Sequence, residues 1–204
     1  MAQQPSRDSR RTALREAARH EEQRQRRRTL LIWGLVGLSM AVIASITVVL
    51  SRPGVQAAAP TSAITYPGLS RGHVSGTVSY AQTPPAGGDH AEVWQNCGIY
   101  TEPVPNETAV HSLEHGAIWI TYQPDLPTDQ VTALQDAVRN QPYGLLSPYP
   151  GDPSPVVATV WGVQLRLDSA TDPRLSAFIA EYADASKAPE PRGECTGGVG
   201  NPQG

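Results

Sequence analysis

The chain has 204 residues, a formal net charge of −3, 39% hydrophobic and 17% charged residues, and two cysteines. This length suits one ordinary domain with extensions, not two full domains. Residues 1–28 carry nine arginines and four acidic residues (net +5), whereas residues 51–204 carry seven basic and fifteen acidic residues (net −8). This separation of charge excludes a soluble cytoplasmic enzyme, and the acidic main part argues against nucleic acid as a partner.

An uncharged apolar run, residues 29–50, separates these two parts. As a helix it would span about 33 Å, enough to cross a hydrocarbon core of about 30 Å. Arginines concentrate before it, so the positive-inside rule predicts a single-pass cell-membrane protein with a cytoplasmic N-terminus and an extracytoplasmic C-terminal domain. A cleaved signal peptide is the alternative, although its apolar region would usually be about 7–15 residues long. The expected partners are the lipid bilayer and, as a second candidate, another membrane protein.

After the apolar run, composition predicts a linker at 51–63, an exported domain at 64–186 and a flexible Pro- and Gly-rich tail at 187–204. The front of the domain is rich in Pro and Gly, and one strand is expected at His73–Tyr80. The expected elements behind it are a strand at 117–122, a helix at 126–140, a strand at 145–149, a strand at 156–167 broken by Gly162, and a helix at 173–185. This order predicts an α+β domain.

Both expected helices carry sequence signals for their first turn. Thr128 is the expected N-cap of the first helix, and Val131, Leu134 and Val138 follow at helical spacing. Asp172 is the expected N-cap of the second helix, because Pro173 directly after it favours the first helical position.

Cys97 and Cys195 both lie on the predicted exported side. Two cysteines in an oxidising compartment indicate a disulfide first. By chain entropy, a closed loop of nearly 100 residues is worth about 4–5 kcal/mol at most. A redox site would need closer cysteines, such as CxxC, and thiolate metal ligation by a pair so distant in sequence is the weaker alternative.

Four of the five histidines lie within one stretch of the exported part: His73, His90, His111 and His115. The last two belong to HSLEHG, which forms a credible helix if Asn106 is its N-cap and Gly116 follows its end. In a helix His111, Glu114 and His115 share one face, whereas in a strand Glu114 turns to the other side. Both a helix and a strand therefore place the imidazoles of His111 and His115 on the same face.

This cluster predicts a transition-metal site, with Zn(II) or Cu(II) as the cofactor. The expected ligands are His90, His111 and His115, completed by His73 or Glu114. Residues 51–204 contain no methionine, which disfavours Cu(I) transport. The alternative is a structural or accessory subunit of a membrane complex, in which the histidines bond to backbone carbonyls or to Glu114 and Asp89.

His-x-x-Glu-His also matches the inverted zinc-protease motif, in which the glutamate acts as general base for a zinc-bound water. Such a protease needs a long active-site helix. Here Pro103 and Pro105 lie close upstream, and Gly116 follows at once. A zinc hydrolase is therefore the third reading, and no residue is assigned a catalytic role.

Several segments in series resemble one bacterial family, domain of unknown function 3105. They are Gly72–Tyr80 (GHVSGTVSY), Pro84–His90 (PPAGGDH), Asn96–Tyr100 (NCGIY), His111–Pro124 (HSLEHGAIWITYQP), Ser147–Pro150 (SPYP) and Ala158–Gly162 (ATVWG). The resemblance covers nearly all of the exported domain. It implies an uncharacterised, exported, membrane-anchored protein of actinobacterial type, with family hallmark residues at His90, His111, Glu114, His115 and Gly116. It implies no particular activity.

Overall fold

The computed structural model describes residues 62–203. The predicted cytoplasmic segment 1–28, the transmembrane helix 29–50 and nearly all of the linker 51–63 lie outside these residues. Within 62–203, no helix combines the length and the apolar character that crossing a bilayer requires.

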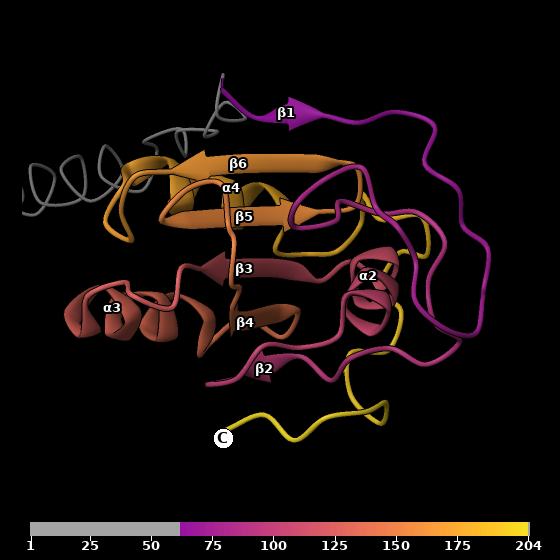
Figure 1. Cartoon of the computed structure of the whole chain (residues 1–204). Helices are drawn as coiled ribbons and strands as arrows, with labels where there is room; N and C mark the ends of the chain where they lie inside the picture. The colour runs from indigo at the N-terminus through magenta and orange to yellow at the C-terminus, as the bar shows by residue number, and fades with distance from the viewer. Residues whose placement is uncertain (1–61, 204) are drawn as a thin grey trace, which may run out of the picture. The chain divides into compact units, whose positions relative to one another are not determined.

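The described part is an α+β domain of three helices and a six-stranded mixed sheet (Figure 1). The helices are α2 (Asn106–His115), α3 (Thr128–Val138) and α4 (Pro173–Tyr182). The strands are β1 (Ile64–Thr65), β2 (Gly98–Ile99), β3 (Ile118–Tyr122), β4 (Gly144–Pro148), β5 (Val156–Val160) and β6 (Val163–Leu167). Their order across the sheet is β1-β6-β5-β3-β4-β2; the pairs β3–β4 and β4–β2 are parallel and the rest antiparallel.

Strand β3 lies inside the sheet, and all five of its side chains are buried. Ile118 and Ile120 face the larger core, which α3 and α4 cover, whereas Trp119 belongs to a smaller core under α2. Because successive side chains of a strand point to opposite faces, a strand covered on both sides must be apolar nearly throughout. This accounts for the AIWITY run that marks β3 in the sequence.

The helices begin close to the predicted positions. The Asp172 carboxylate accepts a hydrogen bond from the Arg174 backbone N–H at 2.9 Å, so the predicted cap of α4 is confirmed. Helix α3 begins at Thr128 itself, and Pro127 occupies the cap position without a side-chain bond. The Pro127 carbonyl accepts from the Val131 N–H at 3.0 Å, so the turn closes without the threonine side chain.

Two predicted strands are wrong as stated. Residues 156–167 form not one interrupted strand but the antiparallel hairpin β5–β6, which turns at Trp161 and Gly162. Gly162 has φ 74°, which reverses the chain rather than merely bending it. His73–Tyr80 forms no strand, and only His73 makes an isolated bridge, to His90. Its alternating residues are mostly small and polar, so this segment offers no apolar face for a neighbour to cover.

The predicted disulfide Cys97–Cys195 is present, with its Cα atoms 5.2 Å apart. Residues 187–203, which composition predicts to be a tail, run beside β2 and the residues just before it. The Asn96 N–H donates to the Val199 carbonyl, and the Gln203 N–H donates to the Ile99 carbonyl, both at 2.8 Å.

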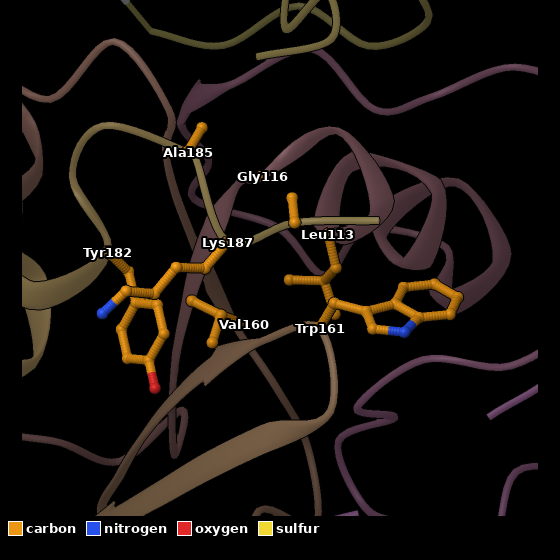
Figure 2. A pocket seen from close by; sticks show the side chains of 8 residues that line it. Leu113, Gly116, Val160, Trp161, Tyr182, Ala185 and Lys187 are labelled. Atoms are coloured by element: carbon orange, nitrogen blue, oxygen red, sulfur yellow. The ribbon is translucent and has the colours of Figure 1, made fainter. Parts of the chain in front are cut away.

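The end of α2 fits closely against the segment that follows α4. Gly116 ends the helix with φ 106°, and a Cβ atom placed on it would lie 2.3 Å from the Ala185 Cβ. A cavity of about 20 Å³ remains beside this contact, lined by Leu113, Val160 and Tyr182 among others (Figure 2). It is large enough for a water molecule and too small for a substrate.

Candidate metal centre

Helix α2 presents three polar side chains to the interior. HSLEHG is helical, as predicted, and His111, Glu114 and His115 are all buried. Asn106 is the first residue of the helix rather than its cap, because Pro105 takes that position and no side chain bonds to it. The i, i+3 and i, i+4 spacing sets all three groups on the face that the preceding segment covers.

Two more histidines reach this face through a backbone bridge between chain segments 17 residues apart. The Val74 N–H donates to the His90 carbonyl at 2.8 Å, and the His90 N–H donates to the Gly72 carbonyl at 2.9 Å. The Asp89 carboxylate secures the same contact by accepting from the Gly72 N–H at 3.0 Å. His90 is fully buried at this bridge, whereas His73 beside it is exposed.

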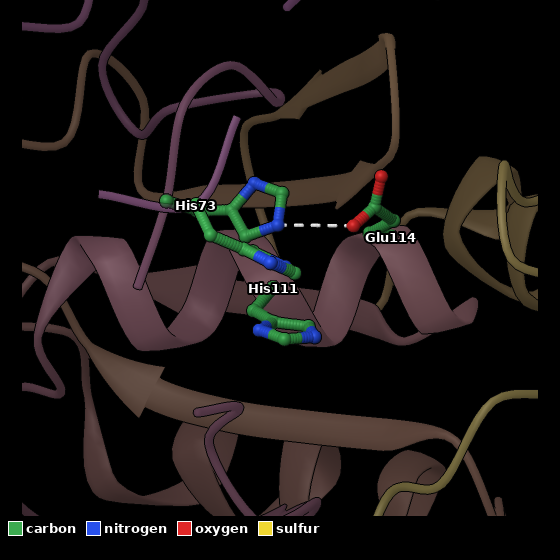
Figure 3. Close-up of side chains that lie close together, drawn as sticks. His73, His111 and Glu114 are labelled. Atoms are coloured by element: carbon green, nitrogen blue, oxygen red, sulfur yellow. Dashed lines mark ion pairs between the residues drawn. The ribbon is translucent and has the colours of Figure 1, made fainter. Parts of the chain in front are cut away.

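These elements bring together His73, His90, His111 and Glu114, which we call the inner cluster (Figure 3). One ligand atom from each residue lies within 4.8 Å of every other. Four atoms so spaced all lie within about 2.9 Å of a common point, against zinc–ligand distances of about 2.0–2.2 Å. A contraction of less than about 1 Å would therefore complete a four-ligand site.

The imidazole hydrogen bonds determine which nitrogen of each ring is free. The His90 Nδ1 lies 2.7 Å from the Gly88 carbonyl oxygen, and the His111 Nδ1 lies 2.7 Å from the Ala91 carbonyl oxygen. Because a carbonyl only accepts, each Nδ1 must carry the hydrogen, which leaves Nε2 as the nitrogen able to bind a metal. A ligand histidine that donates its other N–H to a carbonyl is typical of metal sites.

The contact between His90 and Glu114 is unusual for two buried polar groups. The His90 Nε2 lies 2.9 Å from the Glu114 Oε2 (dashed line in Figure 3), yet it makes no hydrogen bond with residues 62–203. With the hydrogen on Nδ1, a neutral ring directs its Nε2 lone pair at a carboxylate. This arrangement is unfavourable unless the ring is protonated or a cation lies between the two atoms.

Arg71 is a neighbour of the candidate ligands that the sequence did not predict. Its Nε donates to the Glu114 Oε1 at 2.5 Å, and its Nη2 lies 3.6 Å from the Glu190 Oε1. The hydrogen bond to Glu114 raises the pKa of the guanidinium. Arg71 and Glu114 are 43 residues apart and share no motif, so only the fold brings this pair together.

His115 lies beside the inner cluster rather than in it. Its Nδ1 donates to the Glu194 carbonyl at 2.5 Å, and its Nε2 lies 3.0 Å from the His111 Nε2 and 3.5 Å from the Glu190 Oε2. Burial lowers the pKa of His111, and the nearby imidazoles lower it further, whereas the hydrogen bond to the Ala91 carbonyl acts in the opposite direction. Of the predicted ligands, the structure thus groups His73, His90, His111 and Glu114 and sets His115 next to them.

Aromatic side chains surround the histidines. The ring of Trp94 lies 5.1 Å from that of His115 and 5.8 Å from that of His111, and Trp161 meets His90 edge-on at 5.8 Å. Two further hollows, of about 390 and 230 Å³, lie at α3–α4 and beside the disulfide, and neither is lined by a histidine. The histidine cluster thus lies against packed side chains rather than at the mouth of either hollow.

The model of one protein family, described as "Protein of unknown function (DUF3105)", matches residues 73–197. The match covers well over half of the chain, includes the whole inner cluster and confirms the resemblance drawn from the sequence motifs. No curated protein and no solved structure matches the chain.

Proposed function

Because this chain belongs to the DUF3105 family, whose description states no activity, we propose its function from the site itself: the domain binds one divalent transition-metal ion. His73, His90, His111 and Glu114 are the ligands. The observation that carries the proposal is the buried His90 Nε2, which faces the Glu114 carboxylate without a hydrogen bond. A metal ion between these atoms turns an unfavourable contact into two ligand bonds.

Three imidazole nitrogens and one carboxylate oxygen suit Zn(II) or Cu(II). A zinc site with four protein ligands is closed, whereas a catalytic site keeps a position for water. The inner cluster has four candidate ligands, so we propose binding without catalysis. The hydrolase alternative is disfavoured because Glu114 is itself one of the four proposed ligands and Arg71 bonds to its Oε1, so no oxygen of this carboxylate is left to act on a water molecule.

We propose that this domain functions on the outer side of the cell membrane, anchored in the bilayer by residues 29–50 with the N-terminus in the cytoplasm. The charge distribution around the apolar run supports this placement, since arginines concentrate before it. The Cys97–Cys195 disulfide also favours an oxidising compartment. Another membrane protein is the second candidate partner. If the domain binds no metal, the alternative is a structural or accessory subunit of a membrane complex.

The first experiment is elemental analysis of the purified full-length protein, compared with the variants His111→Ala and His73→Ala. His20→Ala is the matched control, because His20 is the one histidine outside residues 73–115. We expect about one Zn or Cu per chain in the wild type and in the control, and loss of metal in His111→Ala. A wild-type protein that contains no metal after reconstitution, with an unchanged Tm in added Zn(II) and Cu(II), would overturn the proposal.

A further inference from the structure

The inner cluster does not use His115, although this side chain is buried and held as firmly as the proposed ligands. Its Nδ1 donates to the Glu194 carbonyl at 2.5 Å, so its free nitrogen is Nε2. That atom lies 3.0 Å from the Nε2 of His111, a ring that carries its hydrogen on Nδ1 and donates it to the Ala91 carbonyl. Two nitrogens without hydrogens therefore face each other.

Two lone pairs at this distance repel each other unless a proton or a metal ion lies between them. The distance between the two nitrogens fits a metal ion. Two nitrogens that each bind tetrahedral Zn(II) at about 2.0–2.1 Å lie about 3.3 Å apart, close to the 3.0 Å between these two.

A third donor lies on the solvent side of this pair. The Glu190 Oε2 is 3.5 Å from the His115 Nε2, and the side chain of Glu190 is 51% exposed. The Glu190 backbone N–H donates to the Glu114 carbonyl at 2.9 Å, which ties this residue to the end of α2. Two imidazoles and one carboxylate match the protein ligand set of an open zinc site.

We propose that His111, His115 and Glu190 form a second metal position, the outer position, which shares His111 with the inner cluster. This inference rests on the proposed function. His111 has one free nitrogen, so a single ion uses it at one position at a time, and the two positions are alternatives for one metal. Arg71 contacts the carboxylates of both positions, Glu114 and Glu190. Its positive charge therefore compensates the negative charge of whichever carboxylate does not bind the metal.

The outer position gives the metal a route between solvent and the inner cluster. With three protein ligands, one of them half exposed, it binds more weakly and accepts a fourth ligand from solution. The chemical class of ligand that exchanges metal here is a small chelate or a donor side chain of another molecule, offering nitrogen, oxygen or sulfur to a divalent ion.

The test is titration of the full-length protein with Co(II), whose visible absorption reports coordination geometry, in a background where the inner cluster is weakened. His73→Ala serves as that background, because His73 is exposed and its loss should leave the fold intact; His90→Gln is the second background. We expect about one Co(II) per chain to remain bound in each. Adding Glu190→Gln or His115→Ala should weaken this residual binding at least about tenfold. Glu102→Gln, an exposed glutamate outside the cluster, is the matched control.

The outcomes separate the two proposals. If the wild type binds Co(II) but both inner variants bind none, the outer position is refuted and the inner cluster stands. The outer ligand set is also refuted if neither Glu190→Gln nor His115→Ala weakens the residual Co(II) binding. If the inner variants bind as tightly as the wild type, the proposed inner ligands are wrong and the outer position stands. A wild type that binds nothing refutes both.

Discussion

The variant Glu114→Gln distinguishes two roles for Glu114, as a metal ligand or as a partner in a structural ion pair. Without metal, a glutamine amide can donate to the lone pair of the His90 Nε2, and its carbonyl can still accept from Arg71. Arg71 is about half exposed, so water screens its ion pair with Glu114. We therefore expect the free energy of unfolding of the metal-free variant to lie within about 1 kcal/mol of wild type.

With metal, the same change should be costly. Free Zn(II) at about 100 times its Kd stabilises the wild-type fold by about 2.7 kcal/mol. For a domain of this size, that corresponds to a rise in Tm of about 10 °C. If losing the carboxylate ligand weakens binding about 100-fold, the same zinc concentration stabilises the variant by only about 0.4 kcal/mol, or about 2 °C.

The assay is thermal unfolding of both proteins, metal-free and over a Zn(II) series, with Glu102→Gln as the control. One result would refute the reasoning: a metal-free variant destabilised by several kcal/mol whose Tm still rises with zinc as the wild type does. Glu114 would then be a structural partner of Arg71 and His90 rather than a ligand.

Three further predictions concern the rest of the chain. Burial raises the pKa of Asp152 to about 7 from 3.8, so the folded state holds a proton that the unfolded state releases, and stability should fall by about 4 kcal/mol as the pH rises from about 4 to 7. In the variant Asp152→Asn, the free energy of unfolding, measured with urea at pH 5 and 8, should depend less on pH. If its pH dependence is unchanged, other groups cause the fall in stability. Replacing Cys97 and Cys195 by serine should cost up to about 4–5 kcal/mol in unfolding experiments, because the bridge closes a loop of 98 residues; reductant added to the variant should change nothing further. Protease added to intact spheroplasts should remove a C-terminal tag and spare an N-terminal one; the reverse pattern would contradict the proposed topology.

The parts of the site that sequence could predict are those set by local geometry. The helical spacing of His111, Glu114 and His115 depends on a few neighbouring residues, and Gly116 marks where the helix must end. Asp172 and Pro173 likewise mark the start of α4. Local signals of this kind need no knowledge of the rest of the chain.

The remaining parts depend on contacts between distant segments. His73 and His90 meet through a bridge, whereas the sequence between them suggests a strand that does not form. Arg71 and Glu190 reach the site from segments with no helix or strand, where hydrophobic periodicity carries no information. For the same reason, the spacing of HSLEH could not show that His73, rather than His115, belongs to the inner cluster.

The C-terminal segment has a consequence for the order in which the metal centre is assembled. Glu194 holds the His115 ring through its backbone carbonyl, and the next residue, Cys195, is joined to Cys97. Glu190 comes from the same stretch. A growing chain therefore has the inner histidines long before it has the residues that orient His115. The proposed outer position therefore forms only after residues 190–195 have folded back onto α2, whereas the inner cluster needs none of them.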